Sequence, residues 1–185
     1  FLISFSLKAY SFSSSPYLIA KSAILLHDFS TASKYYAKYD FYDFDINNLE
    51  KKLIAFVNTD KLLKASVIAK QIIDLDINNQ TAWIVYLANA KLNNDLSVFN
   101  SFEKLDKNNE FDIINFVFYD NNMLKQSNDD IAKAFFSITP TLIENNLHQV
   151  ENYDYLIFYL SLTVNFNPTF DQALFTQAQV FQILK

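Results

Sequence analysis

No glycine occurs among the 185 residues of the chain. Glycine is the residue that adopts positive φ most easily and that lets a backbone approach a phosphate closely. Its absence excludes the phosphate-binding P-loop, the GxGxxG dinucleotide motif and the GxSxG nucleophile elbow. Two-residue β-hairpin turns also lose their preferred residues. The sequence therefore disfavours an all-β fold, and its three prolines leave room for long helices.

Apolar residues follow helical spacing in two neighbouring segments, Lys61–Leu75 and Thr81–Leu92. Such spacing gives a helix of period 3.6 a wide apolar face. Asp76–Asn79 separates the two segments, and Asp and Asn favour turns and caps because their side chains compete for backbone hydrogen bonds. Similar polar turns are expected at Asp45–Asn48 and Asp106–Asn109. A helix–turn–helix unit that repeats about every thirty residues predicts an α-solenoid.

The same reasoning predicts helices along the rest of the chain. Their expected ranges are Tyr17–Leu26, Thr31–Tyr42, Leu49–Asn58, Leu96–Leu105, Phe111–Leu124, Ile131–Ile138 and Tyr153–Asn165, with a last helix after Asn167. We expect Ser15 to cap the first helix, with Pro16 at its first position. We expect Asn167 to cap the last helix in the same way. Pro140 is expected to begin a separate short segment that ends near Leu147.

Ala20, Ala32 and Ala65 are small residues within the predicted helices, and Ala65 lies 33 residues after Ala32. With Tyr36 as the aromatic of the second helix, this pattern resembles the tetratricopeptide repeats. In that family, small residues stand where paired helices approach most closely. The segment YLIAKSAILLHDFSTASKYYAKY is similar to the opening repeat of exported bacterial members of that family. Leu53 and Leu96 depart from the pattern, since they replace small residues.

The resemblance covers most of the chain and implies an all-α fold. Residues 12–185 are expected to form a right-handed α-solenoid of antiparallel helix hairpins. The last helix resembles the first helix of a fresh repeat, and no partner helix follows it in the sequence. We therefore expect the chain to be a fragment, truncated at its C-terminal end.

The first residues have a different character. Phe1–Leu7 is an uncharged apolar run, and Ala9 and Ser11 give the small–x–small pattern that signal peptidase accepts. We interpret residues 1–11 as the remnant of a signal peptide, which predicts an exported, periplasmic protein. The alternative is a cytoplasmic protein in which this run packs on the first hairpin. No apolar run is long enough to span a bilayer, so we expect no membrane span.

Composition narrows the classes of partner. Cysteine is absent, which excludes disulfides, thiolate nucleophiles and cysteine zinc sites. The formal net charge is −5, and every basic residue is a lysine. Nucleic-acid binding needs a basic surface, and bidentate recognition of phosphate needs arginine. We therefore expect no nucleic-acid partner.

Few residues suggest chemistry. His27 and His148 lie far apart, and we interpret both as surface residues rather than metal ligands or catalytic groups. Asp40, Asp43 and Asp45 could offer oxygens to calcium, but the EF-hand order with its central glycine is absent. No Ser–His–Asp arrangement is suggested by the spacing. The sequence predicts no enzyme active site, no metal site and no cofactor.

The resemblance implies a concave face lined by the first helix of each unit. Ile24, Ile54, Val85 and Phe111 are its apolar positions. Its more polar positions, the expected binding residues, are Tyr17, Lys21, Glu50, Asn58, Thr81, Asn89, Asn115 and Tyr119. Side-chain amides can bond the backbone of an extended peptide.

We therefore predict a non-catalytic scaffold that binds a protein or peptide partner on this face. Two alternatives remain open. Ile54 and Val85 could instead cover a neighbouring helix, which would leave the groove idle. The chain could also be a self-associating or intrachain-docking arm of a larger protein, such as an enzyme whose catalytic part lies outside this sequence.

Overall fold

The computed structural model describes residues 14–38, 45–106, 111–119, 126–146 and 152–184. The described residues form helices joined by turns, without a strand, which confirms the all-α prediction. In chain order the elements are α1 (Ser14–Leu25), α2 (Phe29–Lys38), α3 (Ile46–Val57), α4 (Leu62–Leu75), α5 (Gln80–Leu92), α6 (Leu96–Leu105), α7 (Asp112–Ile114), the π-helical turn η1 (Asn115–Tyr119), α8 (Asn128–Asn146), α9 (Asn152–Phe166) and α10 (Asp171–Ile183).

Some predictions concern residues outside the described ranges. They are the signal-peptide remnant in residues 1–11, the carboxylates of Asp40 and Asp43, the turn residues 107–109, the helix ends at Tyr42 and Leu124, the segment end at Leu147, and His148.

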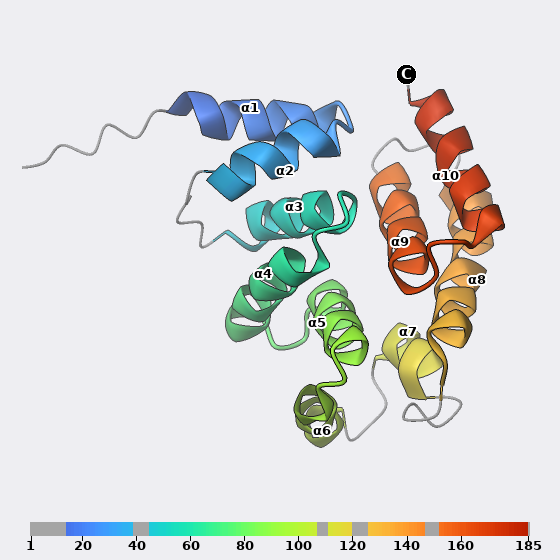
Figure 1. The fold of residues 1–185 in the computed structure, drawn as a ribbon. Coiled ribbons are helices and arrows are strands. Elements are labelled where there is room, and N and C mark those ends of the chain that lie inside the picture. The colour runs from blue at the N-terminus through green and yellow to red at the C-terminus, as the bar shows by residue number, and fades with distance from the viewer. Residues whose placement is uncertain (1–13, 39–44, 107–110, 120–125, 147–151, 185) are drawn as a thin grey trace, which may run out of the picture.

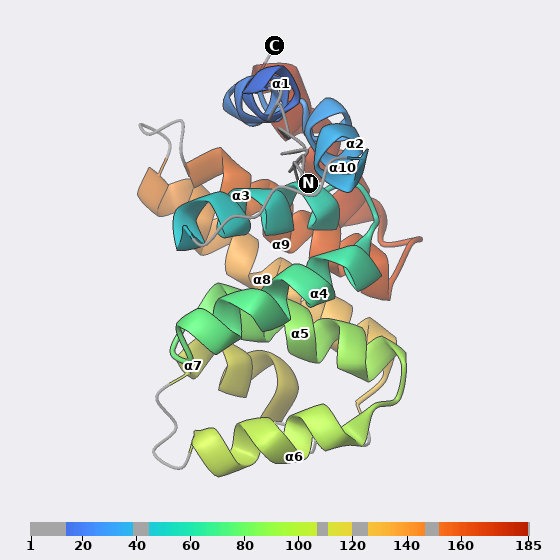
Figure 2. The same cartoon turned by 90° about the vertical axis from the view of Figure 1, so that its left-hand side faces the viewer.

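The chain runs out along one arm and returns along another. In Figure 1, α1 to α6 follow one another down the first arm, α7 lies at the far end, and α8 to α10 lead back up the second arm. Consecutive helices pack on each other in both arms. The return brings α9 against α3, a contact between segments that are far apart in the sequence. Figure 2 shows the stacked helices of the first arm from the side.

Three hairpin turns share one backbone conformation although glycine is absent. His27, Asp60 and Asn94 have φ values of 52°, 55° and 56° and follow the ends of α1, α3 and α5. Asp, Asn and His enter the left-handed region more readily than other residues with a Cβ. In each turn the next residue donates its backbone N–H five residues back, which is the bond of a Schellman motif. These bonds run from Asp28 to Ala23 (2.8 Å), from Lys61 to Phe56 (2.9 Å) and from Asp95 to Ala90 (2.8 Å).

The predicted close-contact positions are buried. Ala20, Ala32 and Ala65 are all fully buried. The assignment of Leu96 to this set is wrong, because Leu96 is 48% exposed. Phe99 takes the place instead: it is the fourth residue of α6, as Ala32 and Ala65 are in α2 and α4, and it is 2% exposed. A phenyl ring needs more room than a methyl group, and α6 packs less closely on α5 than α4 does on α3.

Three helix starts in the first arm lie two or three residues before the predicted ones, and one of them is α2, which begins at Phe29 instead of Thr31. α1 begins at Ser14, so Ser15 lies inside the helix and does not cap it. α3 begins at Ile46, earlier than predicted, because the Asp45 carboxylate accepts a hydrogen bond from the backbone N–H of Asn47 at 3.1 Å. An Asp at the N-cap satisfies a helix donor that would otherwise lack a partner.

The start of the last helix also differs. The side-chain oxygen of Asn167 accepts hydrogen bonds from the backbone N–H and the hydroxyl of Thr169, both at 2.9 Å, and so forms a turn. α10 begins only at Asp171, so Pro168 lies before the helix and not in its first turn.

The prediction that Pro140 begins a new segment is wrong, because α8 continues through it. Proline has no backbone N–H, so the carbonyl of Phe136 loses its normal helical donor. The hydroxyl of Thr139 donates to that carbonyl at 2.8 Å, and Thr139 is 1% exposed. The Thr139 hydroxyl therefore replaces the backbone N–H that Pro140 lacks, and the helix continues through the proline.

We expect Thr139→Val to destabilise the protein by about 1 kcal/mol, because it leaves the Phe136 carbonyl without a partner. Thr176→Val is the matched control, since the Thr176 hydroxyl bonds the Gln172 carbonyl on an exposed part of α10. The measurement is urea unfolding followed by circular dichroism. Equal stability of the two variants would contradict this account of α8.

Burial raises the pKa of Tyr159, in the middle of α9, to about 12. The folded state therefore favours the neutral phenol. Its contribution to stability is fully present below pH 10 and is lost as the pH rises from about 10 to about 12. We expect urea midpoints to fall with pH above 10, and to fall less steeply in Tyr159→Phe. Parallel slopes for wild type and variant would refute this assignment.

Candidate functional site

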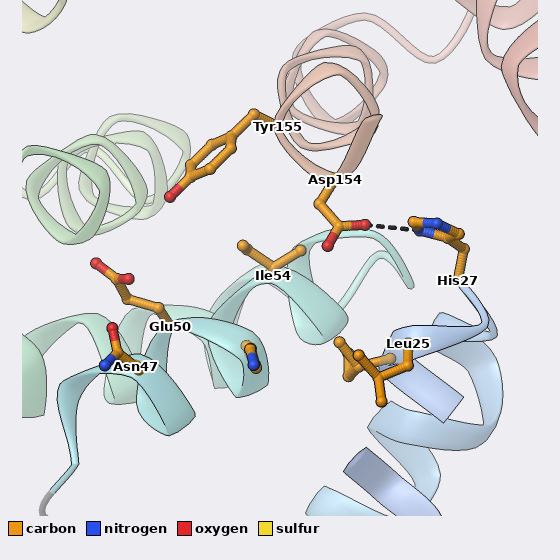
Figure 3. Close-up of a pocket in the computed structure, with 9 residues that line it drawn as sticks. Leu25, His27, Asn47, Glu50, Ile54, Asp154 and Tyr155 are labelled. Atoms are coloured by element: carbon orange, nitrogen blue, oxygen red, sulfur yellow. Dashed lines mark hydrogen bonds and ion pairs between the residues drawn. The ribbon is translucent and has the colours of Figure 1, made fainter. Parts of the chain in front are cut away.

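A cleft of about 470 Å³ lies between the two arms, with the end of α1 and α3 on one side and α9 on the other. We call it the α3–α9 cleft (Figure 3). Its lining residues are Ile24, Leu25, His27, Asn47, Glu50, Lys51, Ile54, Asp154 and Tyr155. The walls combine carboxylates, an amide and an imidazole with aliphatic side chains, a mixture that suits binding sites.

His27 joins the two sides of the cleft. Its Nδ1 lies 2.7 Å from Oδ1 of Asp154 on α9, and the two side chains are 11% and 24% exposed. The left-handed turn after α1 places the ring at this position. The interpretation of His27 as a surface residue is therefore wrong, since the ring is mostly buried and paired across 127 residues of sequence.

Glu50 and Asn79 connect α3 to α5 beside the cleft. Nδ2 of Asn79 donates to Oε1 of Glu50 at 2.7 Å. The oxygen of the same amide accepts from the backbone N–H of Ala82 at 2.9 Å and caps α5. One side chain thus fixes the start of α5 and holds the Glu50 carboxylate in place.

Tyr155 lies on α9 and faces the first arm (Figure 3). Its pKa is raised, first by burial and then by the negative charges of Glu50 and Asp154, whereas a hydrogen bond with Thr81 acts in the opposite direction. The phenol therefore stays neutral at physiological pH. Glu50 and Asp154 lie on opposite walls of the cleft, and the negative charge of each disfavours ionisation of the Tyr155 phenol.

The structure brings only some of the predicted binding residues together. Glu50 lines the cleft, whereas Thr81 does not line it but is near enough to Tyr155 to affect its pKa. Asn58 lies at the other end of α3, in a second cleft of about 290 Å³ against α9 and α10. Neither polar atom of the Asn58 side chain has a hydrogen-bond partner, although both are buried.

Tyr17 and Lys21 lie outside the α3–α9 cleft, on α1. The Lys21 ammonium lies 5.0 Å from the centre of the Tyr17 ring, so the two residues form a cation–π pair. Asn89 is partly exposed near the end of α5 and accepts a hydrogen bond from the Asn93 side chain at 3.2 Å.

Asn115 and Tyr119 belong to the far end of the molecule, in η1. The Asn115 amide donates to Asp106 at 2.9 Å. The Tyr119 hydroxyl is buried without a hydrogen-bond partner, and burial together with the charges of Glu103 and Asp106 raises its pKa. These two residues therefore contribute to packing at the far end rather than to the cleft.

Sequence reasoning missed His27, Asp154 and Tyr155 as site residues. Asp154 and Tyr155 lie in the less regular half of the chain, where the repeat register gives no guidance. Their position depends on how far the second arm folds back, which is a tertiary property. The only local signal was that Asp154 and Tyr155, an acid and an aromatic residue, are adjacent near the start of a predicted helix.

Comparison with family models, with curated proteins and with solved structures returned no match. Within the described residues, no group of three or more His, Cys, Asp or Glu side chains could hold a metal ion. None of the helices in the described ranges combines the length and the apolar character that crossing a membrane requires.

The cleft can bind through hydrogen bonds and charge. A carboxylate accepts about four hydrogen bonds, and the Asn79 amide supplies one of them to Glu50. Ile24 and Ile54 are 3% and 7% exposed and give the cleft an apolar base. Among the described lining residues there is no serine, threonine or cysteine that the His27–Asp154 pair could activate. The arrangement therefore suits recognition of a ligand.

We expect the His27–Asp154 pair to couple the two arms. A double-mutant cycle with His27→Ala and Asp154→Ala should give a coupling energy of about 1 kcal/mol, because both side chains are mostly buried. The exposed pair Lys70–Asp74 within α4 is the control and should couple by about 0.3 kcal/mol. The measurement is urea unfolding of each single and double variant. Additive effects at His27 and Asp154 would contradict the coupling.

Proposed function

We propose that the chain is a non-catalytic helical-repeat scaffold that binds an extended protein segment in the α3–α9 cleft. The finer architecture in this proposal is a right-handed α-solenoid of the tetratricopeptide type. The observation that carries the proposal is the cleft itself, which has one wall on a predicted first helix and combines polar groups with an apolar base.

The repeated hairpins support the solenoid. Three successive turns share a left-handed residue and the same backbone bond, which aligns α1, α3 and α5 in one arm. Glu50, Ile54 and Asn58 are four residues apart, so they share one face of α3. All three line clefts that α9 closes from the other side. The proposed scaffold needs the first helix of a hairpin to line a cleft, and α3 does so.

A second candidate function is an intrachain-docking arm of a larger protein. The observation that favours it is the position of α9, which packs against α3. Val85 is fully buried and Ile54 is 7% exposed, so these predicted groove positions cover neighbouring helices. Under this candidate the chain's own helices use the face that the scaffold would offer to a partner.

The two candidates are separated by a selection from a library of displayed random octapeptides. We expect clones that bind wild type to bind the variant Asn47→Ala several-fold more weakly, since the variant removes a hydrogen-bonding amide from the cleft. The measurement is equilibrium binding of the selected peptides to purified wild type and variants by fluorescence anisotropy.

The matched control is Asn100→Ala, which removes the same amide from an exposed position outside the cleft. It should bind the selected peptides as wild type does. Equal binding to all three proteins would place the site elsewhere. Failure to enrich any clone would favour the docking arm.

A further inference from the structure

We propose that the segment bound in the α3–α9 cleft presents a basic side chain, foremost an arginine, which lies against Tyr155 between the carboxylates of Glu50 and Asp154. This inference rests on the proposed function, because it assumes that the cleft takes an extended segment. It goes further by naming the chemistry that the cleft selects.

The geometry supplies an acid on each wall. Figure 3 shows Glu50 on α3, and Asp154 and Tyr155 on α9, around Ile54, with the Asp154 carboxylate in contact with His27. The cleft measures about 470 Å³, which is large enough for one long side chain. A planar guanidinium has five N–H donors, so it can bond one carboxylate on each side of the cleft.

The charges of the cleft favour a cation. Glu50 is partly buried, and the hydrogen bond that it accepts comes from the neutral amide of Asn79, which does not offset a negative charge. The charges of Glu50 and Asp154 both raise the pKa of Tyr155, so both act on the space beside its ring. Lys51 also lines the cleft, but it is exposed, and solvent screens its charge more strongly than that of a buried group.

The remaining walls suit the rest of a basic side chain. The face of an aromatic ring attracts a guanidinium or an ammonium, and Tyr155 offers such a ring. Ile24 and Ile54 at the base can contact the methylene stem while the charged head stays between the acids. An acidic side chain would meet two carboxylates. A purely apolar one would cover Glu50 and Asp154, which already contact Asn79 and His27, without adding a hydrogen bond to either.

The printed sequence contains no arginine. A second copy of this chain could therefore offer only lysine to the cleft. An arginine preference would identify the occupant as a segment from outside this sequence.

The probe is a set of octapeptide pools with random flanks and a fixed central residue: arginine, lysine, citrulline or glutamate. Citrulline keeps the shape of arginine without its charge. We expect wild type to bind the arginine pool about tenfold more tightly than the citrulline pool, a difference that shrinks as salt is added. The measurement is equilibrium binding by fluorescence anisotropy.

Glu50→Gln is the informative variant, because glutamine still offers an oxygen to Asn79 but carries no charge. We expect it to reduce the arginine-to-citrulline preference to about threefold or less, since one of two acids is lost. Glu103→Gln is the matched control: it removes the same charge from an exposed position on α6 and should leave the preference unchanged. If Glu50→Gln does not fold, Tyr155→Leu removes the aromatic face and should weaken the arginine pool several-fold.

The outcomes separate this inference from the proposed function. If the pools bind wild type but arginine and citrulline bind equally, the basic-residue inference is overturned and the peptide-binding function stands. If the preference is present but survives both Glu50→Gln and Tyr155→Leu, the cation binds elsewhere and the inference also fails. If no pool binds wild type, the proposed function fails and the inference falls with it.

Discussion

The first arm depends on closing helix hairpins without glycine. A residue in the left-handed region is needed after α1, α3 and α5, and the chain uses His27, Asp60 and Asn94. A residue with a Cβ is strained there by roughly 1–2 kcal/mol, and less for Asn and Asp, whose short side chains tolerate the region. The backbone bond that spans each turn helps to offset this cost. The three turns are alike in backbone conformation, although α6 packs less closely on α5 than α4 does on α3.

The first of these turns also determines how the arms meet. A glycine after α1 would close the hairpin with less strain but would contribute no side chain. His27 closes the turn and directs its imidazole to Asp154 on α9. The cleft therefore begins where the left-handed turn and the second arm meet. Its shape follows from a local backbone requirement in one arm and from the fold-back of the other.

The sequence predicted what local physics determines and missed what depends on distant contacts. Helical spacing located α4 and α5 to within a residue, and the buried alanines Ala20, Ala32 and Ala65 were predicted from the resemblance to the tetratricopeptide pattern. Pro140 was misread because a hydroxyl on its neighbour replaces the missing donor, and a propensity for helix breaking does not include that side chain.

Misassignment of Leu96 had a different cause. In α6 the close-contact position holds the large residue Phe99 instead of an alanine. The prediction therefore placed this position at Leu96, about one helical turn too early.

The candidate site was predictable only in part. Glu50 was predicted from the repeat register. Asp154 could not be predicted, because it lies 127 residues from His27 and no local pattern indicates that the two side chains are in contact.

A cleft built from two arms links binding to the fold. Glu50 comes from one arm, and Asp154 and Tyr155 come from the other, so a ligand that contacts both walls binds only when α9 lies against α3. By linkage, such a ligand stabilises the closed arrangement over any state in which the arms separate. The His27–Asp154 and Glu50–Asn79 hydrogen bonds hold both acids in position before binding, which lowers the ordering cost of recognition. Under the proposed function, the His27–Asp154 contact therefore both joins the arms and positions one acid of the cleft.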